Sequence, residues 1–136
     1  MVFTVVLFAY RKPGLTPAAF RAHYENVHVP LMKELGGNLF PISHTRRYIS
    51  RLEKTGTVEE TQQYPAMIIS GSASDFAYDA ITEMVFESQE AFQKFSELLA
   101  KPDIAPTVAE DCAAFLDTSR TPSIVVIGDL CETLRD

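Results

Sequence analysis

Apolar side chains fall into four short runs that have the length and character of β-strands. Residues 2–10 (VFTVVLFAY) are β-branched and aromatic, and the RKPGL sequence after them is typical of a turn. At 42–52 the side chains divide into two alternating faces, and apolar runs return at 78–86 and 123–128. The pattern therefore predicts four strands.

Between the first two strands, apolar side chains repeat at the spacing of an α-helix. Thr16 is suited to cap this helix, and Pro17 is favoured at its first position. Gly36 and Gly37 are expected to end it. The predicted helix covers about residues 17–35, and its apolar face is formed by side chains four, three and four positions apart: Phe20, Tyr24, Val27 and Leu31.

Pro30 lies inside this predicted helix. Proline has no backbone N–H, so the hydrogen bond to the carbonyl of Asn26 is lost and the ring crowds the preceding turn. Val29, which precedes the proline, is also pushed away from helical angles. We therefore expect a kink near residues 26–30, with His28 presented by a distorted turn.

Two further helices are predicted between the third and fourth strands. Ser88 is suited to cap the first, which extends to about residue 100, and the second covers 107–116. We interpret the apolar stripe of the first helix as ordinary core packing. The two stripes are formed by Phe92, Phe95 and Leu99, and by Val108, Cys112 and Phe115.

The elements follow the order strand, helix, strand, strand, helix, helix, strand. This order predicts an α+β fold, a ferredoxin-like βαββαβ unit whose antiparallel four-stranded sheet has helices on one face, in a single domain over 1–136. The uncovered face of the sheet is expected to pair with a second copy, giving a homodimer. Residues 53–63 predict a polar loop, whereas AMIIS (66–70) suits either a short extra strand or an ordered apolar loop.

Composition and charge narrow the functional classes. The 136 residues are 46% hydrophobic and 22% charged, which is typical of a soluble globular domain. A formal charge of −6 disfavours binding to nucleic acid or to anionic membranes. The apolar N-terminus lacks the features of a targeting signal, and no membrane span is expected. Cys112 and Cys131 have no metal-ligand spacing, which favours reduced thiols in a cytoplasmic protein.

His28 is the first candidate for chemistry, because an imidazole exchanges protons near neutral pH. The alternative is that it caps carbonyl groups freed at the kink. Tyr24 lies four residues earlier, on the same helical face, and is equally suited to the core. His23 is five residues before His28, about 140° round an α-helix, so we expect it at the surface and expect no shared metal site.

The predicted strand at 42–52 places His44, Arg46 and Tyr48 on one face. If they are buried, these polar groups need partners, which a pocket for an oxygen-rich ligand supplies. In the alternative, this face is exposed and Ser43, Thr45 and Arg47 point inward, although they make a poor core. Asp79 is expected to pair with Arg46 or with a histidine, or to cap the turn after Tyr78.

Four segments together resemble one family: FAYRKPGLTPAAFRAHYENVHVPLMKEL, SHTRRYI, YDAITEMVFES and EDCAAFLD. They are similar to EthD-domain proteins of the dimeric α/β-barrel superfamily, and most similar to the branch found in fungal aromatic-polyketide clusters. The resemblance extends over about residues 3–127. It implies a small cofactor-free lyase whose site residues match by position at Tyr24, His28, His44, Arg46 and Asp79.

The function we expect is decarboxylation of an anthrone-type or β-keto carboxylic acid through an enolate. His28 and His44 are the expected acid and base in either order, with Tyr24 and Asp79 also catalytic. Arg46 and Tyr48 are expected to bind the small aromatic polyketide, and no metal or cofactor is expected. The alternatives are a dehydratase acting on a β-hydroxy ketone in the same pocket, a non-catalytic accessory binding protein, and a cofactor-free anthrone monooxygenase.

Overall fold

A four-stranded antiparallel sheet forms the centre of the molecule. The structure is a computed structural model that describes residues 1–52 and 64–136, so the predicted polar loop at 53–63 lies outside the described residues. The strand order is β2-β3-β1-β4, which confirms the predicted ferredoxin-like arrangement. The strands are β1 (Phe3–Ala9), β2 (Ser43–Tyr48), β3 (Ala80–Phe86) and β4 (Ser123–Ile127).

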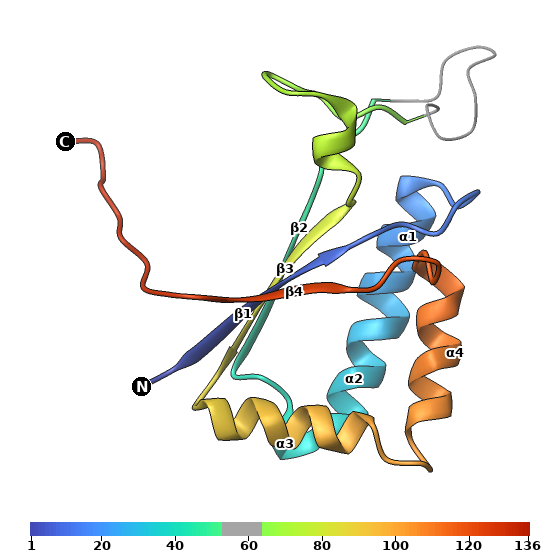
Figure 1. The fold of residues 1–136 in the computed structure, drawn as a ribbon, viewed down its shortest axis with the longest axis vertical. Coiled ribbons are helices and arrows are strands. Elements are labelled where there is room, and N and C mark those ends of the chain that lie inside the picture. The colour runs from blue at the N-terminus through green and yellow to red at the C-terminus, as the bar shows by residue number, and fades with distance from the viewer. Residues whose placement is uncertain (53–63) are drawn as a thin grey trace.

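In the described part of the chain, all the α-helices cover the same face of this sheet, as Figure 1 shows. Strand β1 pairs with both β3 and β4, so that Val5 lies opposite Met84 on one side and Val126 on the other. Because side chains alternate along a strand, every second residue of β1 and β3 points toward the helices, and Val5 and Phe86 are fully buried there. The core therefore lies between the sheet and one layer of helices.

The first predicted helix is interrupted, as its proline predicts. It divides into α1 (Pro17–His23), a π-helical turn η1 (Tyr24–His28) and α2 (Val29–Gly36). Thr16 caps α1 by accepting a hydrogen bond from the N–H of Ala19, 3.1 Å away. In η1 the N–H of Val29 bonds to the carbonyl of Tyr24, five residues back. The predicted distorted turn at His28 is thus confirmed as a widened one, whereas the expectation for Val29 is wrong, since it keeps helical backbone angles.

The two later helices follow their predicted patterns. Helix α3 (Gln89–Leu99) is capped by Ser88, whose hydroxyl accepts from the N–H of Ala91 at 3.1 Å. Helix α4 (Ala105–Phe115) begins two residues earlier than predicted and has proline in its first turn. No helix in the described part of the chain is long and apolar enough to cross a membrane.

Strand β2 turns one polar face toward the helices. His44, Arg46 and Tyr48 are half-buried, whereas Thr45 and Arg47 are exposed. The alternative in which Ser43, Thr45 and Arg47 form the inner face is therefore wrong. Residues 66–70 form an ordered loop without a strand; within it Ala66 makes a single β-bridge to Arg51.

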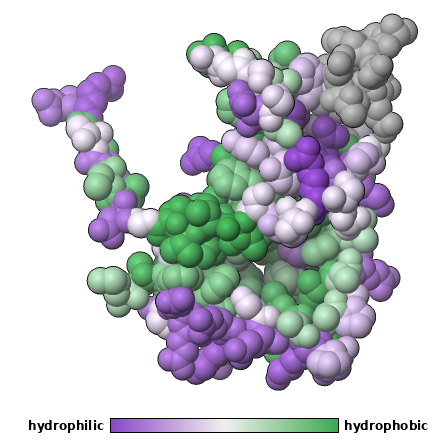
Figure 2. Space-filling model, viewed as in Figure 1, coloured by the Kyte–Doolittle hydropathy of each residue, from purple (hydrophilic) through white to green (hydrophobic). Residues whose placement is uncertain are grey.

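The edge strand β4 is unusually exposed for its composition. Ile124, Val125 and Val126 leave half or more of their surface uncovered, and Figure 2 shows apolar side chains gathered over this strand. Exposed apolar strands are common at interfaces between subunits. Pairing with a second copy stays a prediction.

The two cysteines, Cys112 and Cys131, are both free thiols.

Candidate active site

A cavity of about 400 Å³ lies between the sheet and the helices. Most of its lining is apolar and comes from β1, β3, α3 and α4, including the stripe Phe92, Phe95 and Leu99 that the sequence assigned to core packing alone. Its size and apolar character are typical of a site for a small organic molecule. Polar side chains in the lining include Tyr24, His28, His44, Thr82, Ser96 and Cys112.

His28 reaches this cavity from the π-helical turn and is held by Asp111 of α4. Its Nδ1 lies 2.6 Å from Oδ2 of the Asp111 carboxylate. A carboxylate only accepts hydrogen bonds, so the neutral imidazole carries its proton on Nδ1 and has a lone pair on Nε2. Burial lowers the pKa of His28, and the Asp111 carboxylate partly opposes that shift. His28 therefore has the form of a general base.

The same carboxylate also binds His23, contrary to expectation. Nε2 of His23 lies 2.8 Å from Oδ1 of Asp111, and the half-buried imidazole stacks on Phe115. The prediction of a surface residue on another face than His28 is wrong because it assumed α-helical geometry. In the π-helical turn, residues five apart lie about one turn from each other.

Among residues 1–52 and 64–136, no group of three or more His, Cys, Asp or Glu side chains is arranged to hold a metal ion.

His44 faces the cavity from β2, and its partner is a hydrogen-bond donor, whereas the partner of His28 is an acceptor. Nη1 of Arg46 lies 2.8 Å from its Nδ1, and a guanidinium only donates. Nδ1 of His44 is therefore unprotonated, and the neutral ring carries its proton on Nε2. Burial, the Arg46 charge and nearby His28 lower the pKa of His44 to about 4. At neutral pH His44 is thus a neutral hydrogen-bond donor.

Arg46 is held in turn by Glu25, which the sequence analysis did not select. The guanidinium makes two hydrogen bonds to the Glu25 carboxylate, at 2.6 and 3.1 Å, and these bonds lower the pKa of Glu25. The hydroxyl of Tyr48 donates to the same carboxylate. Neither Arg46 nor Tyr48 lines the cavity. The predicted contact of Arg46 and Tyr48 with the substrate is therefore not seen. Their polar groups bind Glu25 instead of pointing into the cavity.

Tyr24 lies against both histidines. Its ring centre is 5.4 Å from that of His28 and 6.4 Å from that of His44, and its hydroxyl is 2.5 Å from Oγ1 of buried Thr82. Burial raises the pKa of Tyr24 to about 12, so the side chain stays a neutral phenol. The structure therefore brings together Tyr24, His28 and His44 at one cavity, as predicted.

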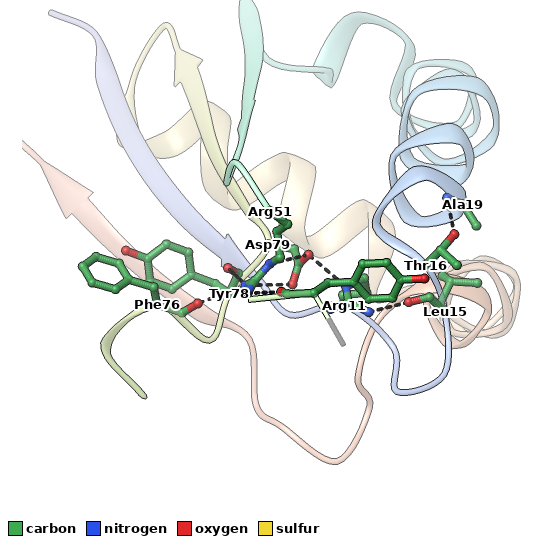
Figure 3. Close-up of polar contacts among 9 residues, drawn as sticks. Arg11, Leu15, Thr16, Ala19, Arg51, Phe76, Tyr78 and Asp79 are labelled. Atoms are coloured by element: carbon green, nitrogen blue, oxygen red, sulfur yellow. Dashed lines mark hydrogen bonds and ion pairs between the residues drawn. The ribbon is translucent and has the colours of Figure 1, made fainter. Parts of the chain in front are cut away.

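Asp79 lies elsewhere, and its expected pairing with Arg46 or a histidine is wrong. Its carboxylate binds Nε of Arg11 at 2.9 Å and Nε of Arg51 at 3.2 Å, as Figure 3 shows. The reason is its place at the entry to β3, where its N–H bonds to the carbonyl of Ala9 at the end of β1. Asp79 lines a second cavity and not the one that the two histidines line.

Asp111 and Glu25, which the sequence analysis did not select, could have been recognised from the sequence as partners of the site residues. Asp111 is three residues after Val108 and four before Phe115, so it lies on the predicted buried stripe of its helix. A carboxylate on such a stripe requires a partner, and His28 was available. Glu25 follows Tyr24 directly, and an inward Arg46 requires a counter-charge.

Comparison with known proteins gives a consistent result. The family model described as "EthD domain" matches residues 12–119. The dehydratase ustZ of Ustilaginoidea virens is 29% identical over 88% of this chain and 78% of its own length. The decarboxylase claH of Passalora fulva is 26% identical over 97% of this chain and 78% of its own length. The structure of an EthD-like protein from Ralstonia eutropha has a TM-score of 0.57 at 16% identity, covering 97% of this chain and 95% of that one, and shares the fold.

Proposed function

The chain belongs to the EthD domain family, and on that basis we propose that it is a lyase acting on a small aromatic polyketide through an enolate, without a cofactor. Relatives named as a dehydratase and a decarboxylase support this class of reaction. The observation that carries the proposal is that two imidazoles line one apolar cavity with opposite hydrogen-bond partners.

His28 is the proton carrier in this proposal. Its Nε2 has a lone pair, and no described residue donates a hydrogen bond to that atom. Asp111 fixes the ring orientation and stabilises the imidazolium that forms when Nε2 takes a proton. Asp111 thus stabilises His28 both as the neutral imidazole and as the imidazolium.

His44 stabilises the enolate oxygen. Its proton is on Nε2, and its low pKa keeps the ring neutral, so it donates a hydrogen bond without itself adding a charge to the ground state. A negative charge that develops on a substrate ketone is therefore met by a donor that is already oriented. Arg46 acts through His44, since it fixes the tautomer by donating to Nδ1.

For decarboxylation, the steps balance with these two residues. His28 takes the proton of the β-keto acid, the bond between the carboxylate and the α-carbon breaks to release carbon dioxide, and the electron pair forms an enolate held by His44. The imidazolium of His28 then protonates the α-carbon. The apolar lining favours this step, because it solvates the carboxylate poorly, and Arg46 is engaged by Glu25 instead of holding the reacting group.

Dehydration is the second candidate, favoured by the relative named as a dehydratase. Here His28 removes the α-proton of a β-hydroxy ketone to form the same enolate. The carbon–oxygen bond then breaks, and the imidazolium returns its proton to the leaving hydroxide as water. Both reactions use one base and one oxyanion donor, so the same pair of histidines serves either.

A homodimer is also part of the proposal. The sheet has helices on one face only, and at its edge β4 exposes Val125 on the uncovered face and Ile124 and Val126 on the other. A second copy placed against this surface would bury them. Size-exclusion chromatography with light scattering tests the prediction, and a monomeric mass at micromolar concentration would contradict it.

The proposed activity is tested by incubating the purified protein with an anthrone-type carboxylic acid and, separately, with a β-hydroxy ketone. Mass spectrometry should show loss of carbon dioxide or of water, and this loss should disappear in His28→Ala. A product yield that is unchanged in both His28→Ala and His44→Ala would instead support an accessory binding role. Uptake of oxygen with substrate would point to a monooxygenase.

A further inference from the structure

A second cavity, of about 350 Å³, lies at the end of the sheet where β1 ends and β3 begins. It is bordered by the segment after β1, the segment after β2, the segment before β3 and the segment after α4. Three residues line both this cavity and the histidine cavity: Tyr10, Asp117 and Arg120. The two cavities are therefore neighbours that share one wall.

The two cavities differ in charge. Arg120 is the only arginine or lysine among the described residues that line the histidine cavity. Among the described residues, the second cavity is lined by three arginines and two aspartates, a formal excess of one positive charge in a chain whose net charge is −6. The charged residues are Arg11, Arg51, Arg120, Asp79 and Asp117. The second cavity thus favours an anion, and the first favours an apolar ring system.

Two of these arginines have mainly structural contacts. Arg51 binds Asp79 and donates to the carbonyls of three residues around it, so each of its three nitrogens already has an acceptor. Arg11 binds Asp79 through Nε and donates from Nη1 to the carbonyl of Leu15. No described residue accepts a hydrogen bond from Nη2 of Arg11. Figure 3 shows the Asp79 carboxylate between the two guanidinium groups.

Arg120 is held more loosely than either of them. Its Nε is 3.8 Å from Oδ2 of Asp117, which is too long for a hydrogen bond, while Oδ1 of Asp117 accepts from Ser119. The guanidinium lies over the ring of Tyr10, 4.3 Å from its centre, and 49% of the side chain is exposed. No described residue accepts a hydrogen bond from this guanidinium, which lines both cavities and can therefore donate to a ligand at the wall between them.

We propose that the two cavities form one two-lobed binding site, and that Arg120, together with Arg11 in the lining of the second cavity, binds a carboxylate at the far end of an aromatic ligand. Arg120 precedes β4, whereas His44 is on β2, and three strand spacings across the sheet amount to about 14 Å. A carboxylate at Arg120 thus lies far from His44, the donor for the enolate oxygen, and is stabilised by the charge contact, so it is retained.

The identity of this ligand as a substrate rests on the proposed lyase function. On that premise, the protein acts on an aromatic acid whose reacting group and anionic group occupy opposite lobes. Binding of an aromatic carboxylate at Arg120 does not depend on any turnover.

A matched pair of probes tests the inference: 2-naphthoate and its neutral counterpart 2-naphthamide, titrated into the full chain by calorimetry at low salt. The wild-type protein should bind naphthoate about tenfold more tightly than naphthamide, because one charge-assisted contact is gained. Arg120→Gln should remove that preference, so that the two probes bind with equal affinity. Arg135→Gln removes the same charge from the exposed C-terminal segment and should keep the preference.

Several outcomes overturn the proposal. They are an equal naphthoate preference in the wild type and in Arg120→Gln, an equal loss of preference in Arg135→Gln, and failure of the wild type to bind naphthoate. His28→Ala separates this proposal from the lyase proposal, because it should abolish turnover and retain the naphthoate preference. If the wild type turns over substrate but Arg120→Gln keeps the naphthoate preference, the two-lobed site is wrong and the lyase proposal stands.

Discussion

His28 and His44 line the same cavity and pack on the same Tyr24 ring, yet their environments are opposite. Nδ1 of His28 faces the carboxylate of Asp111, and Nδ1 of His44 faces the guanidinium of Arg46. A carboxylate requires a proton on the nitrogen it faces, and a guanidinium requires a lone pair. The partner of one ring nitrogen therefore determines what the other nitrogen offers to the cavity.

This difference assigns the roles of proton carrier and hydrogen-bond donor, which the residue type alone leaves open. With its lone pair on Nε2 and a carboxylate to stabilise the imidazolium, His28 is suited to carry a proton. With its proton on Nε2 and a pKa of about 4, His44 is suited to donate a hydrogen bond while it stays neutral. The following changes test whether the two histidines differ in this way.

The largest effect is expected from replacing the proton carrier. His28→Gln should lower kcat by about a thousandfold, because glutamine cannot take up and return a proton. The measurement is single-turnover conversion of the substrate established by mass spectrometry, with binding of a non-reacting analogue measured in parallel.

The matched control for this change is His23→Gln, which alters the other histidine on the same carboxylate. It should keep most of the activity, since Asp111 still holds His28. Equal losses in the two variants would mean that His28 is no more important than its neighbour.

Removing the charge of the carboxylate should have the next largest effect. Asp111→Asn keeps an oxygen that can accept from Nδ1 but removes the charge that raises the pKa of His28. We expect kcat to fall by between about tenfold and a hundredfold, and the acidic limb of the pH–rate profile to move to lower pH. An unchanged profile would show that Asp111 only positions the ring.

On the other side of the cavity, Arg46→Met tests the partner of His44. It removes the donor to Nδ1 and the positive charge that lowers the pKa of His44, so this pKa should rise. NMR titration of the ring protons measures the shift, and kcat should fall by about tenfold because the tautomer is no longer fixed. Arg47→Met, on the exposed face of β2, is the control and should leave the His44 titration unchanged.

The sequence predicted the fold more completely than it predicted these partners. Strand and helix periodicity, the cap at Thr16 and the proline in the first helix are local signals, and each produced the element it predicts. The widened turn changed the angular positions of the residues around it, so His23 was assigned to the wrong face. Such an error follows from assuming 3.6 residues per turn throughout a helix.

The partners of the histidines depend on contacts between segments far apart in the chain. His28 and Asp111 are 83 residues apart, and Glu25 and Arg46 are 21 apart. Periodicity places His28, Asp111 and Arg46 on inward faces but does not say which inward faces meet. The opposite tautomers of the two histidines therefore become visible only when the helices are packed on the sheet.

The smallest expected effect concerns stability, and it again separates the two histidines. Both have a pKa below the value of about 6.5 that holds in an unfolded chain, so the unfolded state binds more protons than the native state as pH falls below 6.5. The free energy of unfolding should therefore decrease from pH 6.5 toward pH 5, by about 1 kcal/mol for each pH unit where His44 dominates. His44→Gln should flatten this dependence more than His28→Gln, because Asp111 offsets part of the burial effect at His28. Urea unfolding at several pH values between 5 and 7 measures the slope, and equal slopes in the two variants would contradict the difference between the rings.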